Sequence, residues 1–262
     1  MGKKGRLDVV LHERGFFPSR EKAKAAVMAG VVSVGGVRAL KAGTPTAMDA
    51  EISVSAPACP YVGRGGLKLE AALDGFSLSV EGLVAIDIGA STGGFTDCLL
   101  KRGARRVYAI DVGYGQLDWK LRNDPRVVNI ERTNIRLLEP SSIPEKAGLV
   151  TIDVSFISLR LVLPVAERLM DAGGRMVCLV KPQFEAGRGQ VGKGGVVRDP
   201  DVHREALRMA RLYADENGLS PAGAMPSPIK GAKGNTEFLL LLERPPLRGL
   251  GNGVSEGHGP EF

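Results

Sequence analysis

The residues from Asp87 to Phe95 form a segment whose composition indicates a ligand-binding turn. It reads DIGASTGGF, so an apolar strand ends in an acid and small residues before a plausible helix. A strand that ends in glycines before a helix often holds a ligand against its backbone. The GxxxGG spacing matches neither the GxGxxG fingerprint of dinucleotide sites nor the GxxxxGKS/T loop of nucleoside triphosphate sites. The segment therefore suits a ligand with a cationic centre and a ribose better than a pyrophosphate.

A second acid follows at the end of the next predicted strand. Asp111 lies roughly 20 residues after the glycine turn, where a carboxylate accepts both hydroxyls of a ribose, unless it only caps a turn. Asn134 follows a third strand and could meet an adenine edge, although a turn-forming role fits equally well. With the glycine turn, these positions resemble the S-adenosylmethionine site of class I methyltransferases. The cofactor-binding residues predicted on this basis are Asp87, Gly89, Ala90, Ser91, Gly93, Gly94, Phe95, Asp111, Asn134 and Asp153.

Two charged residues end later strands. Asp153 lies in VTIDVSF and Lys181 in VCLVKPQFE. Ligands of open α/β sheets bind beyond the carboxyl ends of the strands, so this pair is a candidate for chemistry. The alternative is a structural ion pair at the rim of the sheet. Lys68, in a helix that enters the domain, and Glu237, which begins the final strand, could converge there, although by position alone each is an ordinary solvated charge.

The elements that must position these residues form an α/β pattern. Apolar, β-branched runs at 83–88, 105–112, 126–130, 148–157 and 175–181 alternate with helical stretches, and a last apolar run covers 236–244. This alternation predicts a parallel sheet covered on both faces.

The N-terminal part of the chain has a different pattern. We expect a helix over 20–30 that begins after Ser19 and is closed by Gly30, a hairpin over 31–40 and a strand over 51–54. The stretch 55–66, with two prolines and three glycines, reads as a linker.

The composition narrows the class of protein. A net charge of +6 favours an anionic partner such as nucleic acid, although surplus surface lysine explains it equally well. Cys59, Cys98 and Cys178 are scattered without CxxC spacing, which argues against a disulfide framework or a zinc site and fits a reducing cytoplasm. We expect no signal peptide and no membrane span, because no apolar run approaches the ~20 residues that a membrane helix needs.

At this point the sequence resembles a known family. Lys68, Asp153, Lys181 and Glu237 match, in order, the Lys-Asp-Lys-Glu tetrad of the FtsJ-like ribose 2′-O-methyltransferases, and DIGASTGGFTDCLL resembles their cofactor loop. The stretch RLDVVLHERGFFPSREKAKAAVMAGVVSVGG is similar to the S4 RNA-binding domain. The two together, from residue 6 to about 243, resemble the TlyA, or hemolysin A, family of bacterial ribosomal RNA methyltransferases. The chain departs from that family in having Gly63 where a serine is expected and Tyr61 without a tryptophan in the linker.

The resemblance implies a class I, Rossmann-like methyltransferase domain behind a small α+β S4 domain. The implied boundaries are 1–57 for the S4 domain, 58–63 for a linker, 64–245 for the FtsJ-like domain and 246–262 for a tail that we predict to be disordered.

The resemblance also implies a reaction, S-adenosylmethionine-dependent methylation of a cytidine ribose 2′-hydroxyl in ribosomal RNA. We expect no metal, because no His/Cys/carboxylate cluster is present, and no membrane partner, because the apolar runs do not support a span although the hemolysin name implies lysis. In the implied reaction Lys181 activates the ribose oxygen, as a neutral base or as a charged stabiliser, Asp153 orients Lys181, and Lys68 and Glu237 hold the ribose. The predicted RNA-binding residues are Arg6, Arg20, Lys22, Lys24, Arg64, Arg188, Lys193 and Arg198. Two rival classes are a non-catalytic RNA-binding protein with a methyltransferase fold and a membrane-active hemolysin.

Overall fold

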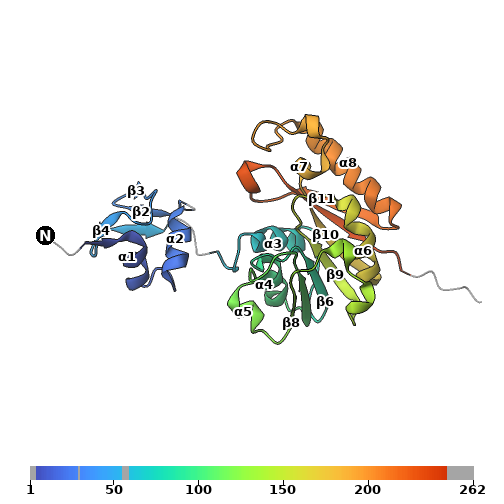
Figure 1. Ribbon diagram of the computed structural model, residues 1–262, viewed down its shortest axis with the longest axis horizontal. Helices are drawn as coiled ribbons and strands as arrows, with labels where there is room; N and C mark the ends of the chain where they lie inside the picture. The colour runs from blue at the N-terminus through green and yellow to red at the C-terminus, as the bar shows by residue number, and fades with distance from the viewer. Residues whose placement is uncertain (1–3, 29, 55–58, 247–262) are drawn as a thin grey trace, which may run out of the picture. The chain divides into compact units, whose positions relative to one another are not determined.

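The chain divides into two compact units between Pro60 and Tyr61. The computed structural model describes residues 4–28, 30–54 and 59–246 (Figure 1). The predicted disordered tail lies outside these residues from 247 onward, and of the predicted linker over 58–63 the structure describes 59–63.

The N-terminal unit packs two helices against short strands. The helices are α1 (Leu7–Glu13) and α2 (Arg20–Met28), and the strands are β1 (Lys4–Arg6), β2 (Val32–Val34), β3 (Val37–Arg38), β4 (Pro45–Ala47) and β5 (Ile52–Val54). The Oγ of Ser19 accepts a hydrogen bond from the backbone N–H of Lys22 at 3.3 Å, so Ser19 caps α2 as predicted. Gly35 and Gly36 both have positive φ, which confirms the glycine turn of the predicted hairpin between β2 and β3.

The C-terminal unit is built on one seven-stranded sheet. Its strand order is β11-β12-β10-β9-β6-β7-β8. The strands are β6 (Val84–Ile88), β7 (Arg106–Ile110), β8 (Val127–Ile130), β9 (Ala147–Ile152), β10 (Met170–Val180), β11 (Ser220–Pro226) and β12 (Phe238–Glu243). All neighbours pair in parallel except β12, which runs antiparallel to both β10 and β11.

This topology confirms the α/β fold class and corrects its detail. The sheet is not wholly parallel, since the last apolar run folds back between two earlier strands. The sequence analysis also missed β11, because SPAGAMP carries two prolines and small residues instead of a β-branched apolar run.

Helices cover both faces of the sheet. They are α3 (Gly65–Gly75), α4 (Gly94–Lys101), α5 (Trp119–Arg122), α6 (Leu163–Leu169), α7 (Pro182–Glu185) and α8 (Pro200–Glu216). Short 3-10 turns lie at Ile135–Leu137, Pro140–Ser142, Leu159–Leu161, Arg188–Gln190 and Ala232–Gly234. One core cluster contains apolar residues of α6 and α8, and the other contains residues of α3, α4 and α5.

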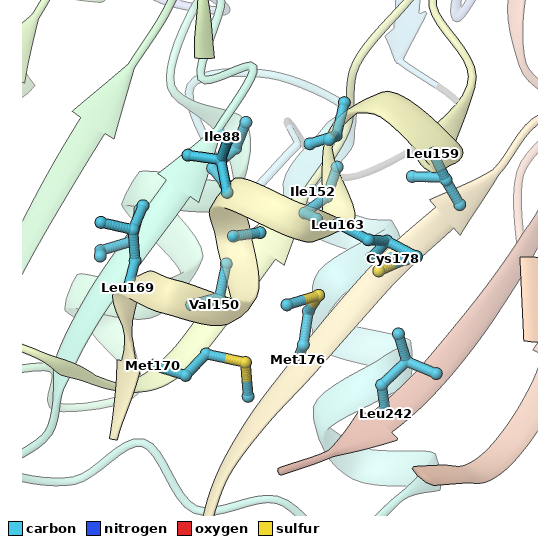
Figure 2. Packing of buried hydrophobic residues seen from close by; sticks show 14 of the residues in the cluster. Ile88, Val150, Ile152, Leu159, Leu163, Leu169, Met170, Met176, Cys178 and Leu242 are labelled. Carbon is cyan, nitrogen blue, oxygen red and sulfur yellow. The ribbon is translucent and has the colours of Figure 1, made fainter. Parts of the chain in front are cut away.

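Alternate residues of each strand point to opposite faces, which is why both faces are apolar. In β6, Ile86 and Ile88 belong to the cluster under α6 and α8, while Ala85 belongs to the cluster under α3 and α4. Figure 2 shows the first cluster, where Leu163 and Leu169 of α6 lie over Ile152 and the strands beside it.

The topology brings several chain segments to one edge of the sheet. The carboxyl ends of the parallel strands meet there, so the residues that follow β6, β7, β9 and β10 are neighbours. Because β12 is reversed, its first residues reach the same edge, and Glu237 immediately precedes it.

Candidate active site

The turn after β6 requires glycine at two positions. Gly89 has φ +88°, and a Cβ there would lie 2.5 Å from the carbonyl oxygen of Asp153. Gly93 has φ +94° at the start of α4, and its Cβ would lie 2.2 Å from a Leu121 methyl group. The backbone of the turn therefore approaches β9 on one side and α5 on the other as no other residue would allow.

Asp87 lies beneath this turn and not in the crevice above it. Its side chain is fully buried and accepts hydrogen bonds from the hydroxyls of Thr96 at 2.7 Å and Thr151 at 3.1 Å. Burial raises the pKa of the Asp87 carboxyl to about 7, against the lowering effect of the two hydroxyls. Asp87 lines neither of the two cavities described below, in contrast to the predicted cofactor contact; it ties β6 to α4 and β9 under the turn.

Asp111 holds the turn from the next strand. Its Oδ2 accepts the backbone N–H of Ser91 at 2.8 Å, and its Oδ1 accepts that of Gly113 at 2.6 Å. Asn134 accepts the backbone N–H of Arg136 at 3.2 Å, so it does form a turn, and it also faces a cavity. Asp111 and Asn134 both line this cavity of about 720 Å³, which has room for a nucleoside.

A second cavity, of about 370 Å³, collects all four residues of the predicted tetrad. The tetrad consists of two ion pairs. Lys181 Nζ lies 2.6 Å from Asp153 Oδ1, and Lys68 Nζ lies 2.6 Å from Glu237 Oε2. The side chains of Lys68, Glu237 and Lys181 are at most 10% exposed, while that of Asp153 is 21% exposed. Buried charges are retained when paired in this way, and here each pair opens into the cavity.

The two cavities adjoin and share lining residues. Gly89, Ser91, Asp153, Ser155 and Phe156 line both of them. A ligand held in the larger cavity can therefore present one end to the two ion pairs. This is the geometry that a group transfer between two bound molecules needs.

Two residues on this wall, Ser155 and Phe156, and the neighbouring Phe184 were not predicted from the sequence. The Oγ of Ser155 accepts a hydrogen bond from Lys181 Nζ at 2.9 Å. Phe156 is 91% exposed, has φ +64°, and its ring centroid lies 5.1 Å from that of Phe184. The available signal was position, because these residues directly follow strands that end in Asp153 and Lys181.

The predicted RNA-binding residues fall into separate groups. Arg64 is exposed and lines the smaller cavity, and Lys193 and Arg198 are exposed in the loop after α7. The side chain of Arg188 lies outside the part of the chain that the structure describes. Arg6, Arg20, Lys22 and Lys24 are exposed on the N-terminal unit.

Two of these arginines have an acidic neighbour. Arg6 Nε lies 3.0 Å and Arg20 Nη2 3.5 Å from the Asp8 carboxylate, whose pKa is lowered chiefly by its hydrogen bond to Arg6. The Asp8 carboxylate on α1 therefore pairs with the last residue of β1 and the first residue of α2, while Lys22 and Lys24 lie exposed further along α2.

Two other classes of site were sought in the described residues. Residues 4–28, 30–54 and 59–246 contain no group of three or more His, Cys, Asp or Glu side chains arranged to hold a metal ion. Among the same residues, no helix has the length and apolar character to cross a membrane.

Comparisons with known proteins agree with this geometry. Residues 61–244 match the FtsJ-like methyltransferase family and residues 5–51 match the S4 domain. The chain is 53% identical over 247 residues to YqxC of Bacillus subtilis, covering 93% of this chain and 87% of YqxC. It is 44% identical over 251 residues to the 16S/23S rRNA (cytidine-2′-O)-methyltransferase TlyA of Mycobacterium tuberculosis, covering 95% and 94%.

A solved structure extends the comparison to three dimensions. A Streptococcus thermophilus protein that carries the hemolysin name superposes with a TM-score of 0.74 at 47% identity, over 94% of this chain and 90% of that one. The fold, the sequence matches and the order of the tetrad agree, and the chain belongs to the FtsJ-like methyltransferases, in the TlyA family that carries an N-terminal S4 domain.

Proposed function

We propose that the protein transfers a methyl group from S-adenosylmethionine to the 2′-hydroxyl of a cytidine in bacterial ribosomal RNA. The observation that supports this best is that the cavity at Asp111 adjoins the cavity of the two ion pairs, with Asp153 lining both. The substrate follows the name of the M. tuberculosis relative, which shares 44% of its residues with this chain. The same substrate assigns the protein to the cytoplasm, where ribosomal subunits are.

The larger cavity suits the cofactor. The Asp111 carboxylate has lone pairs beyond those that accept Ser91 and Gly113, and these suit the hydroxyls of a ribose. The amide of Asn134 faces the same space and suits an adenine edge. When bound, S-adenosylmethionine supplies a methyl group on a positively charged sulfur. Asp153, on the wall that both cavities share, is the carboxylate placed to attract that charge.

The smaller cavity suits the ribose that accepts the methyl group. Lys181 Nζ has three N–H donors, and Asp153 and Ser155 account for two of them. The third would be free to donate to the 2′-oxygen of a bound ribose, which would take the methyl group from the donor sulfur as its hydroxyl proton passed to solvent. We favour a charged Lys181 that stabilises the developing alkoxide, because its Nζ lies 2.6 Å from the Asp153 carboxylate.

The mouth of the smaller cavity suits an RNA nucleotide. The exposed ring of Phe156, beside Phe184, offers a face on which an unstacked base can lie. Arg64 lines the same cavity and can contact a phosphate. Methylation within a folded RNA helix then requires the target nucleotide to leave the stack.

The test is methyl transfer from S-adenosylmethionine labelled in its methyl group to purified ribosomal subunits. The proposal is supported if the RNA becomes labelled and resists alkaline cleavage at one nucleotide, since a 2′-O-methyl group blocks that cleavage. Transfer to a base, or RNA binding without transfer, would overturn it, and the second result would favour the non-catalytic alternative.

A deletion separates RNA binding from chemistry. A chain that begins at Tyr61 keeps the whole sheet and both of its cores, and we expect it to bind S-adenosylmethionine as the full chain does. It should bind ribosomal subunits more weakly and with a shallower salt dependence, because fewer phosphates are contacted. Equal affinity of the two chains for the subunits would exclude an RNA-binding role of the N-terminal unit.

A further inference from the structure

The short helix α7 is attached to the loop after β9 at three points. Glu185 Oε2 accepts the Ser158 hydroxyl at 2.7 Å, and its Oε1 accepts the backbone N–H of Leu159 at 2.9 Å. The residue before Glu185, Phe184, packs against Phe156. Immediately before the helix, Lys181 donates to Ser155 at 2.9 Å.

The loop held in this way is the wall that the two cavities share. Asp153, Ser155 and Phe156 line both cavities, and Ser158 lines the larger one. Phe156 has φ +64°, a conformation that a non-glycine residue keeps only where its surroundings fix it. A fixed attachment is therefore needed close to Phe156.

Glu185 has the chemistry of such an attachment. Both of its partners are donors, and an ionised carboxylate accepts through both oxygens, so the fit is complete in the charged form. Glu185 lies outside the linings of both cavities, so it does not touch either bound molecule. Burial raises the pKa of this carboxyl, while its two hydrogen bonds lower it. Its effect on the reaction must pass through the loop.

We propose that Glu185 is a positioning residue that fixes the loop over 153–159 and thereby sets the Lys181–Asp153–Ser155 geometry. The proposal rests on the proposed active site. Lys181 reaches Asp153 and Ser155 from the strand beside theirs, so a shift of the loop changes both of its contacts at once. Displacements of about 1 Å in such arrangements cost up to ~10²-fold in rate.

The test compares Glu185→Ala and Glu185→Gln with the wild-type chain. The matched control is Glu205→Gln, because Glu205 lies half-exposed on α8, away from the loop, and forms an ion pair with the nearby Arg208. We expect kcat to fall ~10-fold or more in Glu185→Ala. The kcat of Glu185→Gln should fall less, since the amide oxygen of the glutamine still accepts one hydrogen bond. The KM for RNA and the Kd for S-adenosylmethionine should change less than about three-fold, because Arg64, Asp111 and Asn134 are untouched.

A second variant tests the route of the effect. Ser158→Ala removes one donor, and we expect a smaller loss of kcat in the same direction. The double variant Glu185→Ala/Ser158→Ala should be no slower than Glu185→Ala alone, since residues of one network are not additive. If Glu185→Ala does not fold, Glu185→Gln and Ser158→Ala decide the question by the same readout.

Several results would overturn the proposal. One is a wild-type kcat in Glu185→Gln and Ser158→Ala, and another is a lower Tm with kcat unchanged, which would indicate a purely structural role. A third is a double variant whose loss of kcat equals the combined losses of the two single variants. A wild-type chain that transfers no methyl group would instead remove the proposed function itself.

Discussion

Lys181 Nζ and Asp153 Oδ1 lie 2.6 Å apart at the ends of adjacent strands, β10 and β9. This is the arrangement expected of a structural ion pair at the rim of a sheet, and also of a catalytic pair. Lys181 also donates to Ser155 and lines the smaller cavity, which favours the catalytic interpretation. The catalytic role can be tested directly.

Lys181→Ala should leave S-adenosylmethionine affinity almost unchanged, because Asp111 and Asn134 lie on other strands. Single-turnover methylation should slow by ~10²-fold or more, the scale of a lost alkoxide-stabilising group. Lys181→Arg should restore the charge without full activity, since the planar guanidinium is bulkier than an ammonium. Near-normal single-turnover rates in Lys181→Ala would leave the structural ion pair as its only role.

Asp111→Ala should weaken S-adenosylmethionine binding by about 1.5–3 kcal/mol, the usual contribution of hydrogen bonds to a charged group. The substitution also releases the N–H groups of Ser91 and Gly113, so part of the loss comes from the turn. Titration calorimetry gives the number, with Asp215→Ala on the exposed side of α8 as the control. Equal affinities of Asp111→Ala and the control would exclude Asp111 as the ribose acceptor.

Asp87 should make stability depend on pH. Its folded pKa of about 7 lies above the ordinary value of 3.8, so between these values the folded protein binds more protons than the unfolded chain. The contribution of Asp87 to the free energy of unfolding therefore falls as the pH rises through this window, by up to about 1.4 kcal/mol per pH unit.

Asp87→Asn removes that dependence, because the amide resembles the protonated acid and can still bond Thr96 and Thr151. Urea unfolding from pH 5 to pH 8 should show the variant gaining stability relative to the wild type as the pH rises. Parallel curves for the two proteins would mean that Asp87 stays ionised throughout.

Two glycines near the start of the second unit should respond differently to alanine. A Cβ at Gly66 would lie 2.2 Å from the ring of Tyr61, which is buried and donates to Glu70 at 2.7 Å. A Cβ at Gly63 would lie 2.8 Å from the hydroxyl of Thr92, which can rotate away, and 3.8 Å from the Cα of Gly94, an ordinary contact. We expect Gly66→Ala to lower the free energy of unfolding by about 1–3 kcal/mol and Gly63→Ala to change it little. Similar Tm values for both variants would contradict this.

Local patterns in the sequence were enough to predict the elements that carry the site. Asp111, Asp153 and Lys181 each follow an apolar run, and parallel strands bring such ends together whatever the rest of the fold does. Their placement in two adjoining cavities follows from that rule.

Contacts between residues far apart in the sequence could not be predicted from its periodicity. Lys68 and Glu237 are 169 residues apart, and they meet only because β12 is reversed and inserted between β10 and β11. An apolar run in the sequence does not indicate whether its strand lies parallel or antiparallel to its neighbours. Asp87 was placed in the crevice because it ends a strand, yet side chains alternate along β6, and its position turns it toward Thr96 of α4. The family resemblance supplied the tetrad that spacing alone could not.

The two ion pairs of the smaller cavity carry no net charge between them, and this has a consequence for turnover. Under the proposed reaction the donor would bind as a sulfonium cation and would be an uncharged thioether once its methyl group had gone. The Asp153 carboxylate would then attract the cofactor less, while its ion pair with Lys181 would persist. Such a site would distinguish the methylated donor from the spent one by charge and would favour exchange of the product for fresh cofactor.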